Sequence, residues 1–156
     1  MTLFEHAQRF VGEVHEIPGA QHSPFIQWCF EACEGYGPDT PDEVPWCSAW
    51  LNRMCWIVRL PRSKSAAARS WLGIGHGVDL ARAIVGADVV VLKRGVGAQP
   101  GPEVLKASGH VGLFAGRETD RDGKGYVLVL GGNQADGVTV ARFPEEQILG
   151  IRRLIV

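Results

Sequence analysis

The chain has 156 residues, of which 46% are hydrophobic and 21% charged, and its formal net charge is −1. A chain of this length can bury a core without disulfides or metals, so we expect a single domain over residues 1–156. The nearly balanced charge gives no reason to expect nucleic acid or an anionic membrane as a partner. No apolar run reaches the roughly 18 residues of a membrane-spanning helix, so we expect no membrane insertion.

The N-terminal segment, MTLFEHAQRFVGEVHEIPG, is expected to be the first helix of the fold. Charged residues interrupt its apolar pattern, which argues against a signal peptide. Thr2 and Glu5 match a capping box, and apolar residues follow at helical spacing as far as Val14. Ser23 and Pro24 then predict the cap and first position of a second helix. A loop rich in Gly, Pro and Asp over residues 34–45 leads to Cys47.

The second half of the chain changes from helical to strand-like periodicity. Helical spacing over 47–60 ends at Pro61, and SKSAAARSWLGIG (63–75) predicts a short further helix closed by glycine. β-Branched segments bounded by glycine then predict strands at 87–94, 109–116, 125–132, 137–143 and 150–156. Helices followed by strands predict an α+β fold with an antiparallel sheet of five to six strands backed by helices.

The four cysteines, at positions 29, 33, 47 and 55, differ in their surroundings. In the absence of a secretory signal we expect them to be reduced. Cys29 and Cys33 lie on one helical face and are expected to be core thiols; a zinc site completed by His22 has less support, because the spacing differs from that of known zinc sites. We therefore expect no metal and no cofactor.

Cys47 follows Pro-Trp at the predicted start of a helix, where a thiol could serve as a nucleophile. A free thiol is mostly protonated at neutral pH, so a nucleophilic cysteine needs help. Unpaired N–H groups at a helix start and a neighbouring imidazolium both lower the pKa of a thiol. We expect both effects at Cys47, and the alternative is that it is a small core residue like the other three.

His110 is the strongest candidate for the partner of Cys47. His6, His15 and His22 lie among polar residues and are expected to face solvent, while His76 lies in a glycine-rich loop. His110 begins the apolar strand GHVGLF, where the sheet would hold its ring rigidly.

A Cys–His pair needs a third group that orients the imidazole. Asn133, in VLGGNQADG, directly follows a predicted strand and is the first choice, with Gln134 and Asp136 as competitors. The plainer interpretation of Asn133 is a turn residue, because Asn tolerates positive φ.

Residues around Cys47 are candidates for substrate contacts. Asp42, with Asp39 and Glu43, belongs to a loop that is either simply solvated or a groove wall facing amines of the substrate. Trp46 is one of several tryptophans expected mostly in the core, of which one near the thiol could line a groove. DRDGKG (120–125) resembles part of a calcium loop but lacks the remaining ligands, so we expect a turn.

The ordered blocks PWCSAW, SAAARSWL, GHVGLFAG, VLGGNQADGV and GIRRL resemble the cell-wall cysteine hydrolases of the CHAP and NlpC types, in particular a phage and bacterial branch. The resemblance extends from about residue 2 to the C-terminus. It implies a papain-like fold with Cys47 as nucleophile, His110 as base and later acid, and Asn133 as orienting residue. Trp46, Asp42 and Gln134 are the expected substrate-binding residues.

The resulting hypothesis is a peptidoglycan hydrolase that cleaves an amide bond of the stem peptide or cross-bridge. The chain would be made in the cytoplasm and reach the cell wall either as a phage endolysin released by a holin or as an injected antibacterial effector, which would have an immunity protein as partner. Two alternatives keep the fold: a thiol peptidase, deamidase or acyltransferase acting on proteins, and a catalytically silent binding domain.

Overall fold

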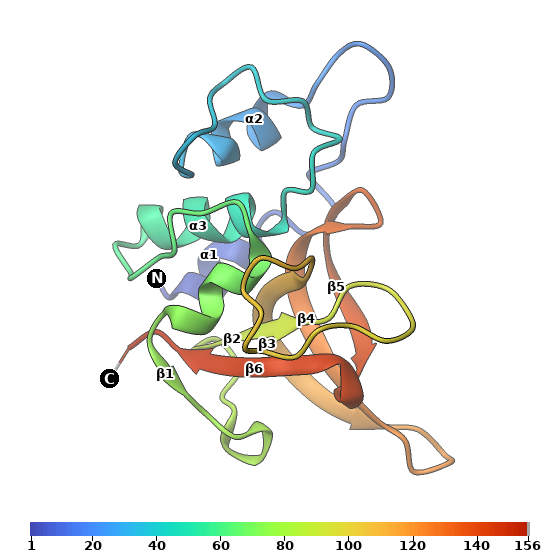
Figure 1. The fold of residues 1–156 in the computed structure, drawn as a ribbon. Helices are drawn as coiled ribbons and strands as arrows, with labels where there is room; N and C mark the ends of the chain where they lie inside the picture. Colours follow the sequence, from blue (N-terminus) through green and yellow to red (C-terminus); the bar gives the residue numbers. More distant parts are fainter. Residues whose placement is uncertain (156) are drawn as a thin grey trace.

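The computed structural model describes residues 1–155 and contains short helices and one sheet (Figure 1). The α-helices are α1 (Leu3–Gln8), α2 (Pro24–Phe30) and α3 (Cys47–Ile57). Short 3₁₀ helices cover Ala68–Gly73, Leu80–Arg82 and Glu145–Gln147. The strands are β1 (His76–Gly77), β2 (Asp88–Leu92), β3 (His110–Thr119), β4 (Gly125–Gln134), β5 (Gly137–Pro144) and β6 (Ile148–Arg153).

The strands form a six-stranded sheet in the order β1-β6-β2-β3-β4-β5, and each neighbouring pair is antiparallel. This arrangement confirms the expected α+β class with an antiparallel sheet. The strand pairs β3–β4 and β4–β5 are consecutive hairpins, whereas β6 returns to lie between β1 and β2. The C-terminal strand β6 therefore connects the edge strand β1 to β2 in the interior of the sheet.

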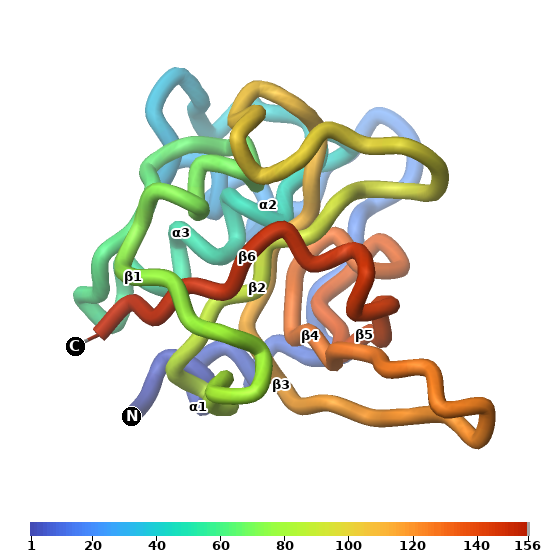
Figure 2. The backbone as a smooth tube through the Cα atoms, turned by 60° about the horizontal axis from the view of Figure 1, so that its bottom comes forward, coloured from blue at the N-terminus to red at the C-terminus, as the bar shows by residue number. Residues whose placement is uncertain are grey.

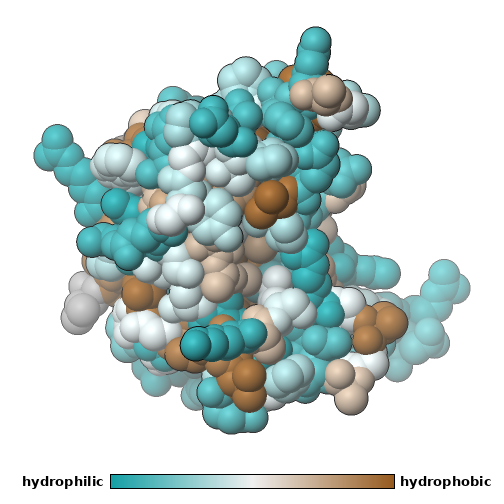
Figure 3. Space-filling model, turned by 45° about the horizontal axis from the view of Figure 1, so that its top comes forward, coloured by the Kyte–Doolittle hydropathy of each residue, from teal (hydrophilic) through white to brown (hydrophobic). Residues whose placement is uncertain are grey.

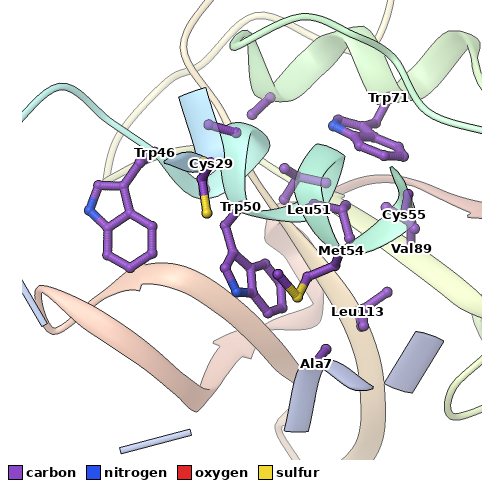
Figure 4. Close-up of a cluster of buried hydrophobic side chains, with 14 of the residues drawn as sticks. Ala7, Cys29, Trp46, Trp50, Leu51, Met54, Cys55, Trp71, Val89 and Leu113 are labelled. Atoms are coloured by element: carbon purple, nitrogen blue, oxygen red, sulfur yellow. The ribbon is translucent and has the colours of Figure 1, made fainter. Parts of the chain in front are cut away.

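Helix α3 lies between α2 and one face of the sheet (Figure 1). Almost the whole helix is buried, which explains why its apolar residues are not confined to one stripe. Figure 4 shows Trp50 and Met54 extending from α3 toward Leu113 of β3, with Trp71 on the other side of the helix. These side chains belong to one core cluster that joins the helices to the sheet.

The opposite face of the sheet has a smaller core of its own. It contains Val90 and Leu92 of β2 together with Phe114, Val127, Val129 and Ile151. Side chains from the segment after β1 and from β5 and β6 pack over it. Because side chains alternate along a strand, Val111 and Leu113 face α3 while His110 and Phe114 face this second core.

Two loops and the termini complete the molecule. The loop between β2 and β3 (93–109) extends beyond the sheet, and both termini lie on one side (Figure 2). On the face in Figure 3, hydrophilic residues predominate and hydrophobic ones form small groups. Among residues 1–155, no helix combines the length and apolar character needed to cross a bilayer.

The helix starts follow the capping signals. Thr2 and Glu5 form the reciprocal capping box, and Ser23 caps α2 with Pro24 at its first position. The first helix is shorter than predicted, because the N–H of Gly12 donates to Val138 O and the N–H of Val138 donates to Val14 O. The chain after Gln8 thus pairs with β5 instead of continuing the helix. The segment 63–75 contains a 3₁₀ helix rather than an α-helix.

Two burial predictions were wrong. His6 was expected in solvent but is only 9% exposed, with its ring edge against Phe10. Trp56 is one of the tryptophans expected mostly in the core, but it is 47% exposed, and the guanidinium groups of Arg53 and Arg62 lie over its ring. Cation–π contacts let an aromatic ring remain at the surface, which a hydrophobic pattern does not reveal.

Candidate active site

Cys47 is the first residue of α3, and a polar network fixes this end of the helix. The hydroxyl of Ser48 donates to Ser65 O and accepts a hydrogen bond from Trp71 Nε1 at 2.9 Å. The side chain of Asn52, one turn later, donates to Ser48 O and Ser65 O and accepts from the N–H of Lys64. These bonds join the helix start to the 63–71 segment and so position the thiol.

The sulfur of Cys47 lies in a buried environment with several donors. Burial raises the pKa of the Cys47 thiol, against the lowering effects of the Val111 N–H, the Arg94 charge and the N–H groups of Ser48 and Cys47. The expected lowering of this pKa is therefore incorrect, because desolvation outweighs the donors. The thiol is protonated at neutral pH and needs a base for nucleophilic attack.

The start of β3 meets the thiol. Val111, whose N–H favours the thiolate of Cys47, directly follows His110, and Gly109 lines the same depression as Cys47. Gly109 and Val111, the residues before and after His110, therefore both lie near the sulfur of Cys47. The predicted nucleophile and the predicted base therefore lie at the same end of the sheet, Cys47 on the α3 face and the His110 ring beside Phe143 on the face of the second core.

The ring of His110 is oriented by Gln134. Nε2 of His110 lies 2.8 Å from Oε1 of Gln134. The amide nitrogen of Gln134 donates to Val129 O, Thr139 O and Thr139 Oγ1, which fixes the amide with its oxygen toward the imidazole. An amide oxygen only accepts, so Nε2 of the neutral ring carries the proton and Nδ1 has a free lone pair.

Burial also determines the charge of the imidazole. Desolvation lowers the pKa of His110, and Arg94 adds to this effect while Gln134 opposes it. The ring packs at 5.3 Å from that of Phe143. A neutral imidazole at physiological pH can accept a proton, as a general base must.

Asn133, the expected orienting residue, makes no side-chain hydrogen bond within residues 1–155. Its φ of 57° belongs to an irregularity in the β4–β5 pairing between Gly131 and Gln134. In a regular strand Asn133 would share the face of Gly131, which is the His110 face. The irregularity brings Gln134 onto that face instead. Asp136, the other competitor, is exposed at the following turn.

The glycines before Asn133 allow this close packing. A Cβ on Gly131 would lie 2.7 Å from Gln134 Oε1, and one on Gly132 would lie 2.6 Å from the ring of Trp46. Neither distance is compatible with a side chain. The double glycine therefore lets β4 approach the His110–Gln134 pair on one face and the start of α3 on the other.

Two depressions adjoin at Arg94. One, of about 450 Å³, is lined by Cys47, Pro45, Ser108, Gly109 and Lys106 among others. The other, of about 280 Å³, is lined by His110, Asn133, Gln134 and Phe143 among others. Arg94 borders both, so a ligand extending from one to the other would pass this side chain.

The wall of the Cys47 depression is held by Arg69. This buried side chain donates to four carbonyl oxygens, those of Pro100, Gly101, Val104 and Ser108. The charge has no carboxylate partner within residues 1–155, so backbone dipoles of the β2–β3 loop solvate it. Sequence reasoning missed this role, although a lone arginine in the apolar run AAARSW was a signal for it.

Asp42 does not form a groove wall. Its carboxylate is buried, accepts the N–H groups of Ile17 and Ser23, and contacts Nδ1 of His22 at 3.0 Å. His22, Asp42 and Glu43 are the one described group whose donor atoms lie close enough, within 4.8 Å, to hold a metal. Because backbone donors already occupy the central carboxylate, the group is explained as an anchor of the 34–45 loop.

Trp46 does not line a groove either. Its ring is fully buried, and Nε1 donates to Glu16 Oε1 at 2.8 Å. The remaining cysteines are core residues, as expected: burial raises the pKa of Cys33 to about 11, and raises the pKa of Cys29 and Cys55 further. Cys47 is distinguished from the others by its position as the first residue of α3, in the depression that Gly109 and Arg94 also line.

Another depression lies beside the termini and is separate from this site. It is lined by apolar side chains such as Leu3, Phe4, Val58, Leu60 and Val85. Among the described residues that line it there is no thiol, imidazole or carboxylate. This depression therefore lacks the groups that the candidate chemistry of Cys47 and His110 requires.

No model of a known protein family matches this chain, and no curated protein matches it. The candidate site is thus defined by its own geometry: a buried thiol at a helix start, and an imidazole at a strand start oriented by a glutamine.

Proposed function

We propose that the protein is a thiol hydrolase of the papain-like CHAP and NlpC type, which cleaves an amide bond of the peptidoglycan stem peptide or cross-bridge. The observation that carries this proposal is the arrangement of Cys47, His110 and Gln134. A thiol at an α3 start meets the β3 start, whose imidazole has its tautomer fixed by Gln134. In this assignment Gln134 takes the orienting role expected of Asn133.

The mechanism starts from a thiol and a neutral imidazole. Nδ1 of His110 takes the Cys47 proton as sulfur attacks the amide carbon, giving a tetrahedral intermediate with a negative oxygen. The backbone N–H of Cys47 is a suitable donor to that oxygen, because no side chain caps the start of α3. The imidazolium then protonates the leaving amine and a thioester remains. Water, deprotonated by His110, hydrolyses the thioester and restores the thiol.

The assignment to peptidoglycan rests on the resemblance of the ordered motifs to cell-wall hydrolases. The test is mass spectrometry of muropeptides released from purified sacculi by the wild type and by Cys47→Ala. We expect new amine and carboxyl ends with the wild type and none with Cys47→Ala. Cys33→Ala removes a different buried thiol, so it should release the wild-type products if its thermal unfolding shows that it remains folded.

Each alternative predicts another result. A thiol enzyme acting on proteins would leave sacculi intact while Cys47 still reacts with iodoacetamide. A silent binding domain would bind sacculi without releasing products from them. Identical products from wild type and Cys47→Ala would refute the thiol mechanism itself.

A further inference from the structure

The two depressions at Cys47 and His110 are lined by positive side chains. Lys93 and Arg94 border the His110 depression, and Arg94 and Lys106 border the Cys47 depression. Among the described residues lining either one, there is no aspartate or glutamate. The whole chain has a net charge of −1, so this concentration of positive charge is local to the site.

Arg94 is the central cation of this group. Its side chain is exposed, and within residues 1–155 it makes no salt bridge and donates no hydrogen bond. Several other surface arginines are paired, for example Arg117 with Glu145 and Arg142 with Glu118. Arg94 thus has its full set of donors available to a ligand, and a guanidinium matches a carboxylate in a bidentate geometry.

The position of Arg94 also places its charge near the reacting groups. Arg94 lines the depression that contains Cys47 and also the one that contains His110. A ligand anion beside Arg94 would therefore lie next to the amide that Cys47 attacks. A carboxylate several residues away from that amide would not benefit from this contact.

From this charge pattern we propose that the site selects substrates with a free carboxylate adjacent to the scissile amide, with Arg94 as the residue that binds it. The inference rests on the proposed thiol hydrolysis and adds the chemical class of the segment bound. It replaces the expected acidic wall for substrate amines, because Asp42 is buried and the lining is cationic.

The experiment compares alkylation of Cys47 by iodoacetate and by iodoacetamide, which differ in charge. In both reactions the thiolate attacks the CH₂ carbon and iodide leaves. The ratio of the two rates cancels the thiolate fraction, so a change in the thiol pKa does not affect it. Peptide mass spectrometry identifies modified Cys47, and Cys47→Ser provides the blank.

We expect the iodoacetate-to-iodoacetamide ratio at Cys47 to exceed that of glutathione by roughly three- to tenfold at low salt, as one nearby positive charge would produce. Salt should reduce the excess. Arg94→Gln should remove most of it, whereas Arg121→Gln, at the exposed turn after β3, should retain it. Muropeptides with free carboxylates should likewise be cleaved faster than their amidated forms, with the difference lost in Arg94→Gln.

The outcomes separate this inference from the proposed function. Equal ratios in wild type and Arg94→Gln would overturn the role of Arg94, and an unchanged Cys47-dependent release of muropeptides would leave the hydrolase proposal standing. If neither reagent modifies Cys47 and no muropeptide is released, the nucleophile itself is refuted and the inference fails with it.

Discussion

Gln134 holds the imidazole of His110 through a 2.8 Å bond, while Thr139 and Val129 hold Gln134 itself. The amide can therefore neither rotate nor exchange its oxygen for its nitrogen without leaving carbonyl groups unpaired. Thr139 and Val129 fix Gln134, and Gln134 in turn fixes His110. Gln134 is therefore a positioning residue, because it acts on the substrate only through His110.

The first prediction concerns this pair. Gln134→Ala should lower kcat for muropeptide release by roughly 100-fold, the scale of a general-base contribution, with little change in KM. Gln134→Glu should instead raise the pKa of His110, because a carboxylate stabilises the imidazolium, and should move the acid limb of the kcat profile to higher pH. Nitrogen NMR of the histidine ring reports this pKa and the tautomer directly.

Asn133→Ala is the matched control, since its side chain makes no hydrogen bond within the described part of the chain. It should retain the His110 pKa and most of the activity. A loss of activity in Asn133→Ala equal to that in Gln134→Ala, with an unmoved His110 titration, would contradict the assignment.

The second prediction concerns the pH dependence of the thiol and of the reaction. Burial raises the pKa of Cys47, so its alkylation rate should still be rising at pH values where a free thiol, with a pKa of about 8.5, has levelled off. The pKa of His110 is lowered from 6.5, so the base stays neutral and the reaction should remain active somewhat below that pH. Alkylation rates of Cys47, measured in quenched reactions from pH 6 to roughly pH 10, report the raised pKa of the thiol. A plateau in the alkylation rate near neutral pH would instead indicate a thiolate–imidazolium pair.

The third prediction concerns the packing of β4 against α3. Gly132→Ala should lower the free energy of unfolding by about 1–3 kcal/mol, because its Cβ would overlap the ring of Trp46 and the Cβ of Trp50. Urea unfolding measures the change. Gly73→Ala is the control, since a Cβ there meets no atom within 4 Å. Equal stabilities of the two variants would show that the strand can shift without cost.

The fourth prediction concerns the anchor at Asp42. Burial alone would raise the pKa of Asp42, but the N–H groups of Ile17 and Ser23 and the His22 ring outweigh it and hold the pKa below 3.8. The ionised carboxylate thus stabilises the fold above pH 3.8, and this contribution is lost as pH falls through the lower folded-state pKa. Asp42→Asn should destabilise the protein by roughly 2 kcal/mol at neutral pH.

The difference between wild type and Asp42→Asn should shrink as the pH falls below 3.8, because the wild type then loses its own ionised contacts. Thermal unfolding over that pH range is the measurement. Asp39→Asn, at an exposed position of the same loop, should match the wild type throughout. A destabilisation independent of pH would point to packing rather than charge.

Local chemistry explains which parts of the fold could be predicted. The capping box of Thr2, the Ser23–Pro24 start and the strands bounded by glycine all depend on neighbours in sequence, and the structure contains them. The end of the first helix and the two-residue strand β1 depend on distant partners, Val138 for Gly12 and Arg153 for His76. Helical spacing alone could not reveal these pairings.

The candidate site divides in the same way. Cys47 and His110 could be singled out because their positions at element starts are visible in the sequence. The choice between Asn133 and Gln134 depended on one positive φ in β4, which reverses the facing of the residues after it. Asparagine tolerates this conformation, so Asn133 permits the irregularity, and Gln134 is the residue that the irregularity turns toward His110. The prediction assigned the orienting role to Asn133.

The hydrogen bonds of Arg69 reduce the entropy that is lost when a ligand binds at this site. By donating to carbonyls along residues 100–108, it orders a loop that would otherwise sample many conformations. The conformational entropy of this loop is lost when the protein folds. A ligand that enters beside Lys106 and Arg94 therefore need not immobilise the wall it contacts. Affinity at this wall should therefore depend on the fit of charges to a fixed surface, and ligands that require the loop to move should bind poorly.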